Sequence, residues 1–165
     1  MKIINGNVIK AFKECKEYCV LIHIVNNKGV FGAGFAKALS SSFPITKVDY
    51  QKRLDELTLN GDNLLGAIGV SDIDGKEIIH LYAQDGYGRD KNKQYLSYDS
   101  LIRCLNKVKF RLKLDIETKK LKNVKIIMPY LIGCGLANGD ETIVKSIIDL
   151  AFEDFKEVDV IAYRP

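Results

Sequence analysis

Three glycines fall within six residues of one another directly after an apolar stretch near the start of the chain. The stretch Val20–Val25 leads to Asn26, Gly29, Gly32 and Gly34 follow, and a helical pattern then takes over. Glycine lets the backbone approach a ligand closely, and the N–H groups that open a helix attract anions. The spacing indicates a site for a diphosphate or a phosphorylated sugar. A turn that only redirects the chain explains this segment alone equally well.

A second segment of the same kind lies near the end of the chain. Val124–Pro129 is typical of a buried strand, Gly133 and Gly135 follow it, and helical periodicity resumes after Asp140. Two such loops can close on one ligand if their strands are neighbours, because α/β folds place their sites at the carboxyl ends of strands. Neither loop has a Walker A sequence, and the order G-x-x-G-x-G in the first loop argues against a Rossmann nicotinamide site.

Three polar residues near these loops are candidates for sugar binding or proton transfer. Asn26 carries an amide that can bond sugar hydroxyls, or it can cap a turn. His23 lies inside an apolar strand, where a lone histidine is usually a core residue, yet imidazole can exchange a proton near neutral pH. Asp140 is either the N-cap of the next helix or a carboxylate that orients water or acts as a base. The residues alone leave each pair of roles open.

Four segments of the chain resemble the macro domain, a module that binds ADP-ribose. They are Ile3–Ile9, the first glycine loop with Asn26, the second glycine loop, and Val158–Tyr163. The middle segments Leu81–Arg89 and Tyr98–Leu101 are similar to the branch of yeast-type ADP-ribose 1″-phosphate phosphatases and their phage-encoded relatives. The resemblance covers nearly the whole chain and implies an α/β fold, a three-layer α/β/α macro domain with a mixed, largely parallel sheet.

The same resemblance implies a ligand, a reaction and a set of contacts. The ligand is ADP-ribose or its 1″-phosphate, and the reaction is hydrolysis of the terminal phosphate by His23 and Asp140. We expect no metal and no other cofactor. The expected ligand-binding residues are Asn7, Asn26, Gly29, Gly32, Ala33, Gly34, Phe35, Gly133, Cys134, Gly135, Leu136 and Ala137.

Departures from the macro domain pattern bear on two alternative functions. Asn7 stands where many members have an aspartate that accepts from the adenine amine, so we expect weaker selectivity for adenine. Ala137 stands where deacylating relatives have an aspartate, which counts against an ADP-ribosyl hydrolase acting on modified protein or nucleic acid. The other alternative is a reader that only binds free or attached ADP-ribose. Asp85 and Arg89 lie in a loop that either closes over the ligand or has no role.

The four cysteines predict reduced thiols with a mostly structural role. Cys15 and Cys19 have helical spacing, but no second pair of cysteines or histidines completes a zinc set. Cys134 lies inside a glycine loop and is therefore also a candidate nucleophile. Because no histidine neighbours it in the sequence, a small side chain that fills a tight turn is the better interpretation.

Strands and helices alternate along the chain, as in α/β folds. We expect strands at Lys2–Asn5, Val20–Val25, Ala67–Ser71, Glu77–Ala83, Val124–Met128 and Val158–Tyr163. We expect helices at Ala11–Glu17, Val30–Ser42, Ile45–Leu59, Tyr98–Leu121 and Glu141–Phe155. The pair Asp74-Gly75 is typical of a hairpin turn. In the fourth helix, an apolar stripe is expected to face the core and to leave the basic residues in solvent; it consists of Leu101, Leu105, Val108, Leu112 and Ile116.

The composition is that of an ordinary globular chain. The 165 residues are 47% hydrophobic and 28% charged, which argues against disorder and predicts one domain, residues 1–165. The net charge of +4 makes only a weak case for nucleic acid. No apolar run reaches membrane-spanning length and the N-terminus does not resemble a signal peptide, so we expect a cytoplasmic protein without a membrane partner.

Overall fold

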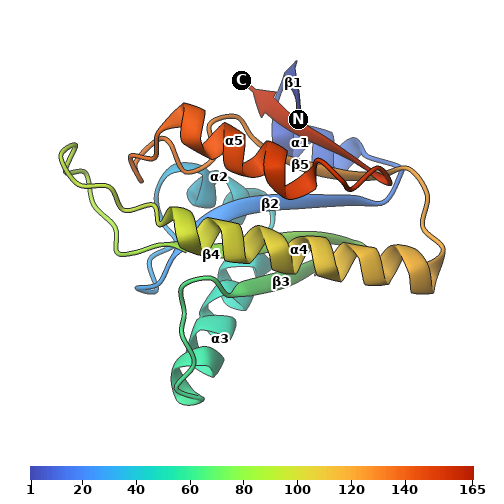
Figure 1. Cartoon of the computed structure of the whole chain (residues 1–165). Helices are drawn as coiled ribbons and strands as arrows, with labels where there is room; N and C mark the ends of the chain where they lie inside the picture. Colours follow the sequence, from blue (N-terminus) through green and yellow to red (C-terminus); the bar gives the residue numbers. More distant parts are fainter.

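The most apolar runs of the sequence form the centre of one six-stranded sheet (Figure 1). The computed structural model describes residues 1–165. The strands are β1 (Lys2–Asn5), β2 (Cys19–Asn26), β3 (Ile68–Ile73), β4 (Lys76–Gln84), β5 (Val124–Pro129) and β6 (Val158–Arg164). They lie in the order β1-β6-β5-β2-β4-β3, and only β3 runs antiparallel to its neighbour. The sheet is mixed and largely parallel, as expected.

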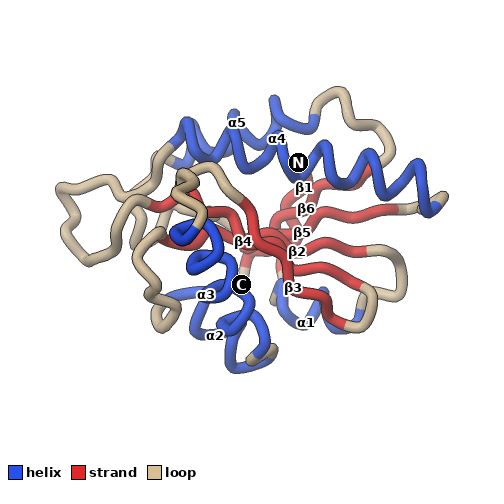
Figure 2. The backbone as a smooth tube through the Cα atoms, turned by 90° about the horizontal axis from the view of Figure 1, so that it is seen from below, coloured by secondary structure: helices blue, strands red, loops and turns tan.

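Helices cover both faces of the sheet. They are α1 (Val8–Glu14), α2 (Gly34–Ser42), α3 (Ile45–Leu59), α4 (Tyr98–Lys119) and α5 (Glu141–Phe152). Figure 2 shows α4 and α5 along one face and α1, α2 and α3 along the other, which is a three-layer α/β/α fold. None of these helices combines the length and the apolar composition that a membrane span needs.

Two local patterns have the structure that their sequence predicts. Asp74 and Gly75 both have positive φ, 53° and 86°, and they link β3 to β4 in a tight hairpin. The apolar stripe of α4 packs into the largest core cluster, where four of its members are fully buried and Ile116 lies at the margin. Both patterns depend on residues close together in the chain, so the sequence suffices to predict them.

The boundaries predicted for three helices are wrong. Helix α1 covers Val8–Glu14 instead of Ala11–Glu17, because the side chain of Asn7 accepts from the Lys10 N–H and starts the helix early. Helix α2 begins at Gly34 and not at Val30. Phe31, which is buried, lies in the loop that precedes it. Helix α5 ends at Phe152, three residues before the predicted end. Beside α2 and α5 a buried apolar residue, Phe31 and Phe155 respectively, lies outside the helix, so periodicity alone misplaces the boundary.

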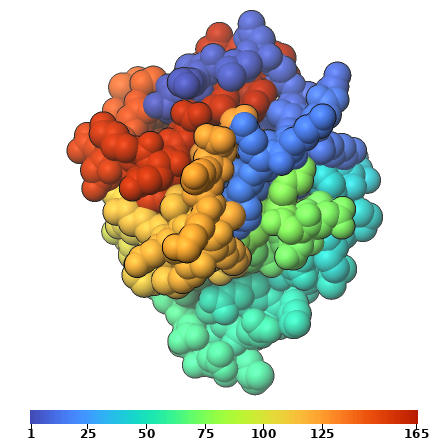
Figure 3. Space-filling view, turned by 90° about the vertical axis from the view of Figure 1, so that its right-hand side faces the viewer, coloured from blue at the N-terminus to red at the C-terminus, as the bar shows by residue number.

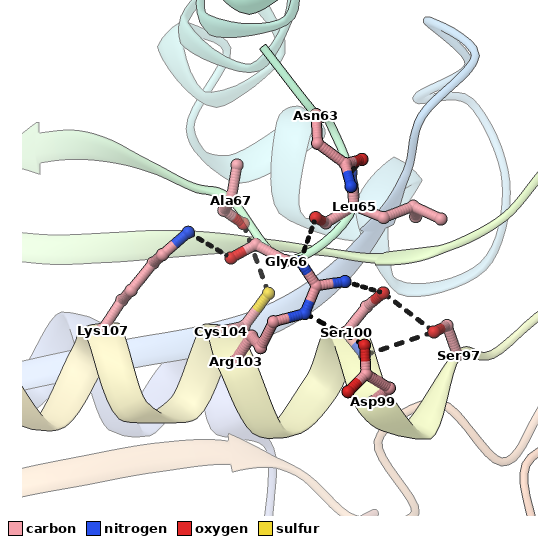
Figure 4. Close-up of polar contacts among 10 residues, drawn as sticks. All are labelled: Asn63, Leu65, Gly66, Ala67, Ser97, Asp99, Ser100, Arg103, Cys104 and Lys107. Atoms are coloured by element: carbon pink, nitrogen blue, oxygen red, sulfur yellow. Dashed lines mark hydrogen bonds and ion pairs between the residues drawn. The ribbon is translucent and has the colours of Figure 1, made fainter.

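The connection between α3 and β3 is held against α4 by polar side chains (Figure 4). Arg103 donates from Nη1 to the Leu65 carbonyl at 3.2 Å, and Lys107 donates from Nζ to the Gly66 carbonyl at 2.7 Å. Gly66 has φ +86°, and a Cβ atom there would lie 2.7 Å from Nη1 of Arg103. The positive φ favours glycine here, and a larger residue would have to displace the guanidinium.

The strand order brings three carboxyl ends together at one edge of the sheet. The neighbouring parallel strands β5, β2 and β4 end at Pro129, Asn26 and Gln84. The loops that follow them include both glycine loops and the long connection to α4. Figure 3 shows the opposite end of the sheet, where the β3–β4 hairpin lies beside the α1–β2 and α4–β5 connections. Because both glycine loops follow the carboxyl ends of these strands, the candidate site is at the carboxyl edge.

Candidate functional site

A cavity of about 400 Å³ lies at this carboxyl edge. Its walls come from the first glycine loop and the start of α2, from the second glycine loop, and from the β4–α4 loop. The residues that line it are His23, Ile24, Val25, Asn26, Val30, Phe31, Ala33, Gly34, Phe35, Ala36, Gln84, Tyr87, Gly88, Arg89, Pro129, Tyr130, Leu131, Ile132, Gly133, Gly135, Leu136 and Ala137. The fold thus brings the two glycine loops, which are a hundred residues apart in the chain, into one site.

Asn26 organises the first glycine loop from within. Its Oδ1 accepts from the N–H groups of Lys28 at 2.9 Å and Val30 at 3.3 Å, and its Nδ2 donates to the Val30 carbonyl at 2.6 Å. Oδ1 also lies 2.9 Å from the hydroxyl of Tyr50 on α3. These contacts use the amide oxygen fully and leave one Nδ2 hydrogen without a partner. The turn-capping role of Asn26 is therefore observed, and its contact with a ribose stays a prediction.

The start of α2 offers unpaired N–H groups to the cavity. The N-cap residue Ala33 has no side chain that could accept from the first turn, and Ala33, Gly34, Phe35 and Ala36 all line the cavity. The open end of a helix is a site for anions because these N–H groups lack partners inside the helix. The Cδ1 atom of Leu136 lies 3.8 Å from where a Cβ of Gly34 would be, so the two glycine loops lie close together here.

The second glycine loop is tightly folded. Gly133 has φ +73°, and a Cβ atom there would lie 2.8 Å from Cδ1 of Ile24. The loop is closed by a hydrogen bond from the Gly139 N–H to the Gly133 carbonyl at 2.9 Å. By contrast, a Cβ at Gly135 would meet nothing within 4 Å. Gly133 is required by the fold, whereas the space beside Gly135 is open to a ligand.

The β4–α4 loop completes the cavity and contributes its one charged side chain. Arg89 is exposed, and it is the only lysine, arginine, aspartate or glutamate among the lining residues. Tyr87 and Gln84 also line the cavity, and sequence reasoning missed both as site residues. The signal available for them was their place at the end of a buried strand, for Gln84, and in the glycine-punctuated loop that follows it, for Tyr87. The loop is tied to the second glycine loop by Asn138, whose Nδ2 donates to the carbonyls of Asp90 and Lys93.

The two predicted catalytic residues have different positions. His23 lines the cavity but is only 1% exposed, and its Nε2 lies 2.6 Å from Nδ1 of His80. Burial, and to a lesser extent His80, lowers the pKa of His23 well below its usual value, so the ring is neutral at pH 7. Asp140 is exposed, caps α5 by accepting from the Ile143 N–H at 3.0 Å, and does not line the cavity.

Four other predicted ligand-binding residues also lie outside the lining. Asn7 caps α1, Gly29 donates its N–H to the hydroxyl of Tyr50, and Gly32 is exposed in the first loop. Cys134 borders a smaller pocket of about 140 Å³ beside α5, and its Sγ lies 3.5 Å from the Ile132 carbonyl. Burial raises the pKa of Cys134 to about 11, so the thiol is protonated at neutral pH. Ligand contacts by these four residues stay predictions.

Comparisons with known proteins identify the architecture. No protein-family model and no curated protein matches the chain. A protein of unknown function from Bacteroides thetaiotaomicron is 26% identical, with 99% of this chain and 97% of that chain covered and a TM-score of 0.80. The macrodomain of Thermus aquaticus DarG is 23% identical, with 99% and 97% covered and a TM-score of 0.71.

A third solved structure was determined with a ligand. Thermosipho africanus DarTG in complex with ADP-ribose is 17% identical, with 88% of this chain and 38% of that chain covered and a TM-score of 0.63. These likenesses, together with the strand order and the helical layers, show that the chain has the macrodomain fold.

Proposed function

We propose that the chain binds ADP-ribose across the carboxyl edge of the sheet. The diphosphate would contact the backbone N–H groups of residues 32–35 and 133–137, and Asn26 would face the distal ribose. The observation that carries this proposal is that both glycine loops line one cavity. The structure of Thermosipho africanus DarTG with ADP-ribose supports it, because 38% of that chain has a similar fold.

The chemistry of the cavity suits a diphosphate joined to two sugars. Backbone N–H groups at the open end of α2 can hold the anion without a bound cation. The lining also contains the rings of Phe35, Tyr87 and Tyr130, against which a sugar or a base can pack. Arg89 adds one positive charge with a fork of donors that matches phosphate oxygens.

Calorimetry with ADP-ribose in metal-free buffer tests the binding proposal. Gly135→Val should weaken binding several-fold or more, because its side chain occupies open space beside the cavity without striking the protein. Gly61→Ala, in the exposed turn after α3, is the control and should bind like the wild type. Absence of a binding signal with the wild type, or equal affinity in a folded Gly135→Val protein, contradicts the proposal.

We further propose that the chain hydrolyses ADP-ribose 1″-phosphate to ADP-ribose and phosphate. Two observations support this finer function: the cavity contains one cation, Arg89, and one imidazole, His23. The terminal phosphate adds negative charge to that of the diphosphate, and a neutral imidazole can donate to its oxygens. Asp140 would take part only if its carboxylate turned from the α5 cap toward the ligand.

Release of phosphate from ADP-ribose 1″-phosphate tests the reaction. We expect His23→Ala and Asp140→Asn each to lower the rate by about 10²-fold or more, as for general acid–base groups, with little change in ADP-ribose binding in Asp140→Asn. Asparagine remains a good N-cap, so Asp140→Asn keeps the start of α5. A melting curve must accompany His23→Ala because the residue is buried.

Phosphate release, ADP-ribose binding and release of ADP-ribose from modified macromolecules together separate the alternatives. Wild-type rates in both folded variants would show that neither residue is catalytic. Tight binding of ADP-ribose without phosphate release would favour a reader of free or attached ADP-ribose. Release of ADP-ribose from modified protein or nucleic acid, with no action on the 1″-phosphate, would favour an ADP-ribosyl hydrolase.

A further inference from the structure

Three buried polar side chains form a hydrogen-bonded row across the sheet beside the cavity. Nε2 of His23 on β2 lies 2.6 Å from Nδ1 of His80 on β4, and Nε2 of His80 lies 3.0 Å from Oγ of Ser71 on β3. All three residues are at most 1% exposed. Nδ1 of His23 ends the row, is buried, and has no hydrogen-bond partner.

Both imidazoles in this row are neutral at pH 7. Burial lowers the pKa of His80 to about 3, and burial with the neighbouring ring of His80 lowers the pKa of His23 well below its usual value. Phe31 packs edge-on against both rings, with centroids 5.7 Å from His23 and 6.0 Å from His80. Each neutral ring therefore carries one N–H donor and one acceptor nitrogen, and the row must run in one direction.

Counting hydrogens selects that direction. If Ser71 donates to His80 and His80 donates to His23, both contacts are satisfied and one group is left over, the Nδ1–H of His23. If the row runs the other way, the Ser71 hydroxyl hydrogen and the Nδ1 lone pair of His23 are both buried without partners. An unsatisfied buried donor or acceptor costs about 1–3 kcal/mol. The first direction leaves one such group instead of two and is the more stable.

We infer that Ser71 and His80 are positioning residues that hold His23 in the Nδ1–H tautomer, as a neutral hydrogen-bond donor for an acceptor oxygen of the ligand. The ligand part of this inference rests on the proposed ADP-ribose site. The Nδ1–H tautomer makes His23 a donor to a phosphate or sugar oxygen, because a protonated Nδ1 has no free lone pair with which to act as a base.

Phe35 lies next to His23 and shares the cavity lining with it. The Phe35 ring lies 5.8 Å from the His23 ring, is half-buried, and lines the cavity in the first turn of α2. Phe31 on the other side is a core residue at 3% exposure. A ligand bound at the start of α2 would reach Nδ1 when the Phe35 ring turns aside.

Nitrogen NMR of the imidazoles tests the tautomer without any ligand. The chain contains two histidines, so a spectrum of the tag-free protein at pH 7 shows His23 and His80 alone. We expect both rings to have a protonated Nδ1 and an unprotonated Nε2. A protonated Nε2 on His23 would overturn the inference.

Variants of Ser71 distinguish positioning from packing. In Ser71→Ala no hydroxyl donates to His80, so the hydrogen bonds of the row can run in either direction. The NMR signals of the ring nitrogens of both histidines should then shift or broaden. Ser71→Thr keeps the hydroxyl and should give the wild-type spectrum. Ser100→Ala, which removes a buried hydroxyl on α4, is the matched control and should leave the spectrum unchanged. An unchanged spectrum in Ser71→Ala would show that the hydroxyl only fills space.

Titration with ADP-ribose completes the test. We expect the Nδ1 proton of His23 to shift on binding, and Ser71→Ala to bind several-fold more weakly than Ser100→Ala at matched thermal stability. Binding detected by calorimetry without any response at Nδ1 would overturn the donor role. No binding at all would refute the proposed function and with it the donor role, while the ligand-free spectrum still decides the tautomer.

Discussion

The hydroxyl of Tyr50 lies 2.9 Å from Oδ1 of Asn26 and 2.8 Å from the backbone oxygen of the same residue. It also accepts the N–H of Gly29 at 3.0 Å. One buried hydroxyl on α3 therefore fixes the end of β2 and the first glycine loop together. Helix α3 contributes no residue to the cavity lining, yet it holds the loop that forms one wall.

Removing this hydroxyl should loosen the first glycine loop. We expect Tyr50→Phe to lower the free energy of unfolding by about 1–3 kcal/mol, because the Gly29 N–H loses its partner. ADP-ribose should bind several-fold more weakly in calorimetry. The control is Tyr82→Phe, which removes a buried hydroxyl that donates to the Tyr50 carbonyl and does not touch the loop. Equal affinities in the two variants would contradict a role of Tyr50 in ordering the site.

Asn7, the N-cap of α1, should influence which nucleobase the ligand carries. Oδ1 of Asn7 already accepts from the Lys10 N–H, so the rest of the amide is a donor group. Asn7→Asp supplies a second, charged acceptor and keeps the cap, and charge-assisted hydrogen bonds are roughly twice as strong as neutral ones. We expect the variant to prefer ADP-ribose over other nucleoside-diphosphate riboses more strongly in a competition assay. Unchanged discrimination would show that Asn7 does not face the base.

Gly66 lies close to the guanidinium of Arg103, and replacing it should lower the stability of the protein. Gly66→Ala should cost about 1–3 kcal/mol for its left-handed backbone and more for the collision with the guanidinium. Gly75→Ala is the matched control, because it has the same φ of +86° and open space around it. Urea unfolding should show a larger loss for Gly66→Ala than for Gly75→Ala. Equal losses would mean that Arg103 moves away without cost.

The buried histidine pair should make stability depend on pH. The pKa values of both histidines are lowered in the folded protein, whereas in the unfolded chain they are about 6.5. The unfolded chain therefore binds more protons below this pH, and the histidine contribution to stability, fully present above pH 6.5, is lost as the pH falls. We expect a loss of roughly 1–2 kcal/mol per histidine between pH 7 and pH 5 in urea unfolding. His80→Gln should show a smaller loss, and equal pH dependence in both proteins would contradict the buried, neutral state.

Much of the fold follows from local sequence patterns. The apolar runs that become β2, β4 and β5 are buried almost throughout, and the Asp74-Gly75 turn pairs β3 with β4. The α4 stripe faces the core because its spacing matches the helical period. These features depend on residues a few positions apart, whose backbone preferences and apolar spacing can be read along the chain. The two glycine loops were identified for the same reason.

The composition of the cavity was decided by the tertiary structure. The sequence determined that glycine loops follow two buried strands, but only the order β5-β2-β4 brings those loops and Arg89 around one space. Likewise, the sequence offered both His23 and Asp140 as candidate catalytic residues. The fold places His23 beside the cavity and Asp140 at the N-cap of α5. The partner of His23, His80, comes from a strand 57 residues further along the chain. Such contacts depend on strand pairing across the whole sheet, which no local pattern specifies.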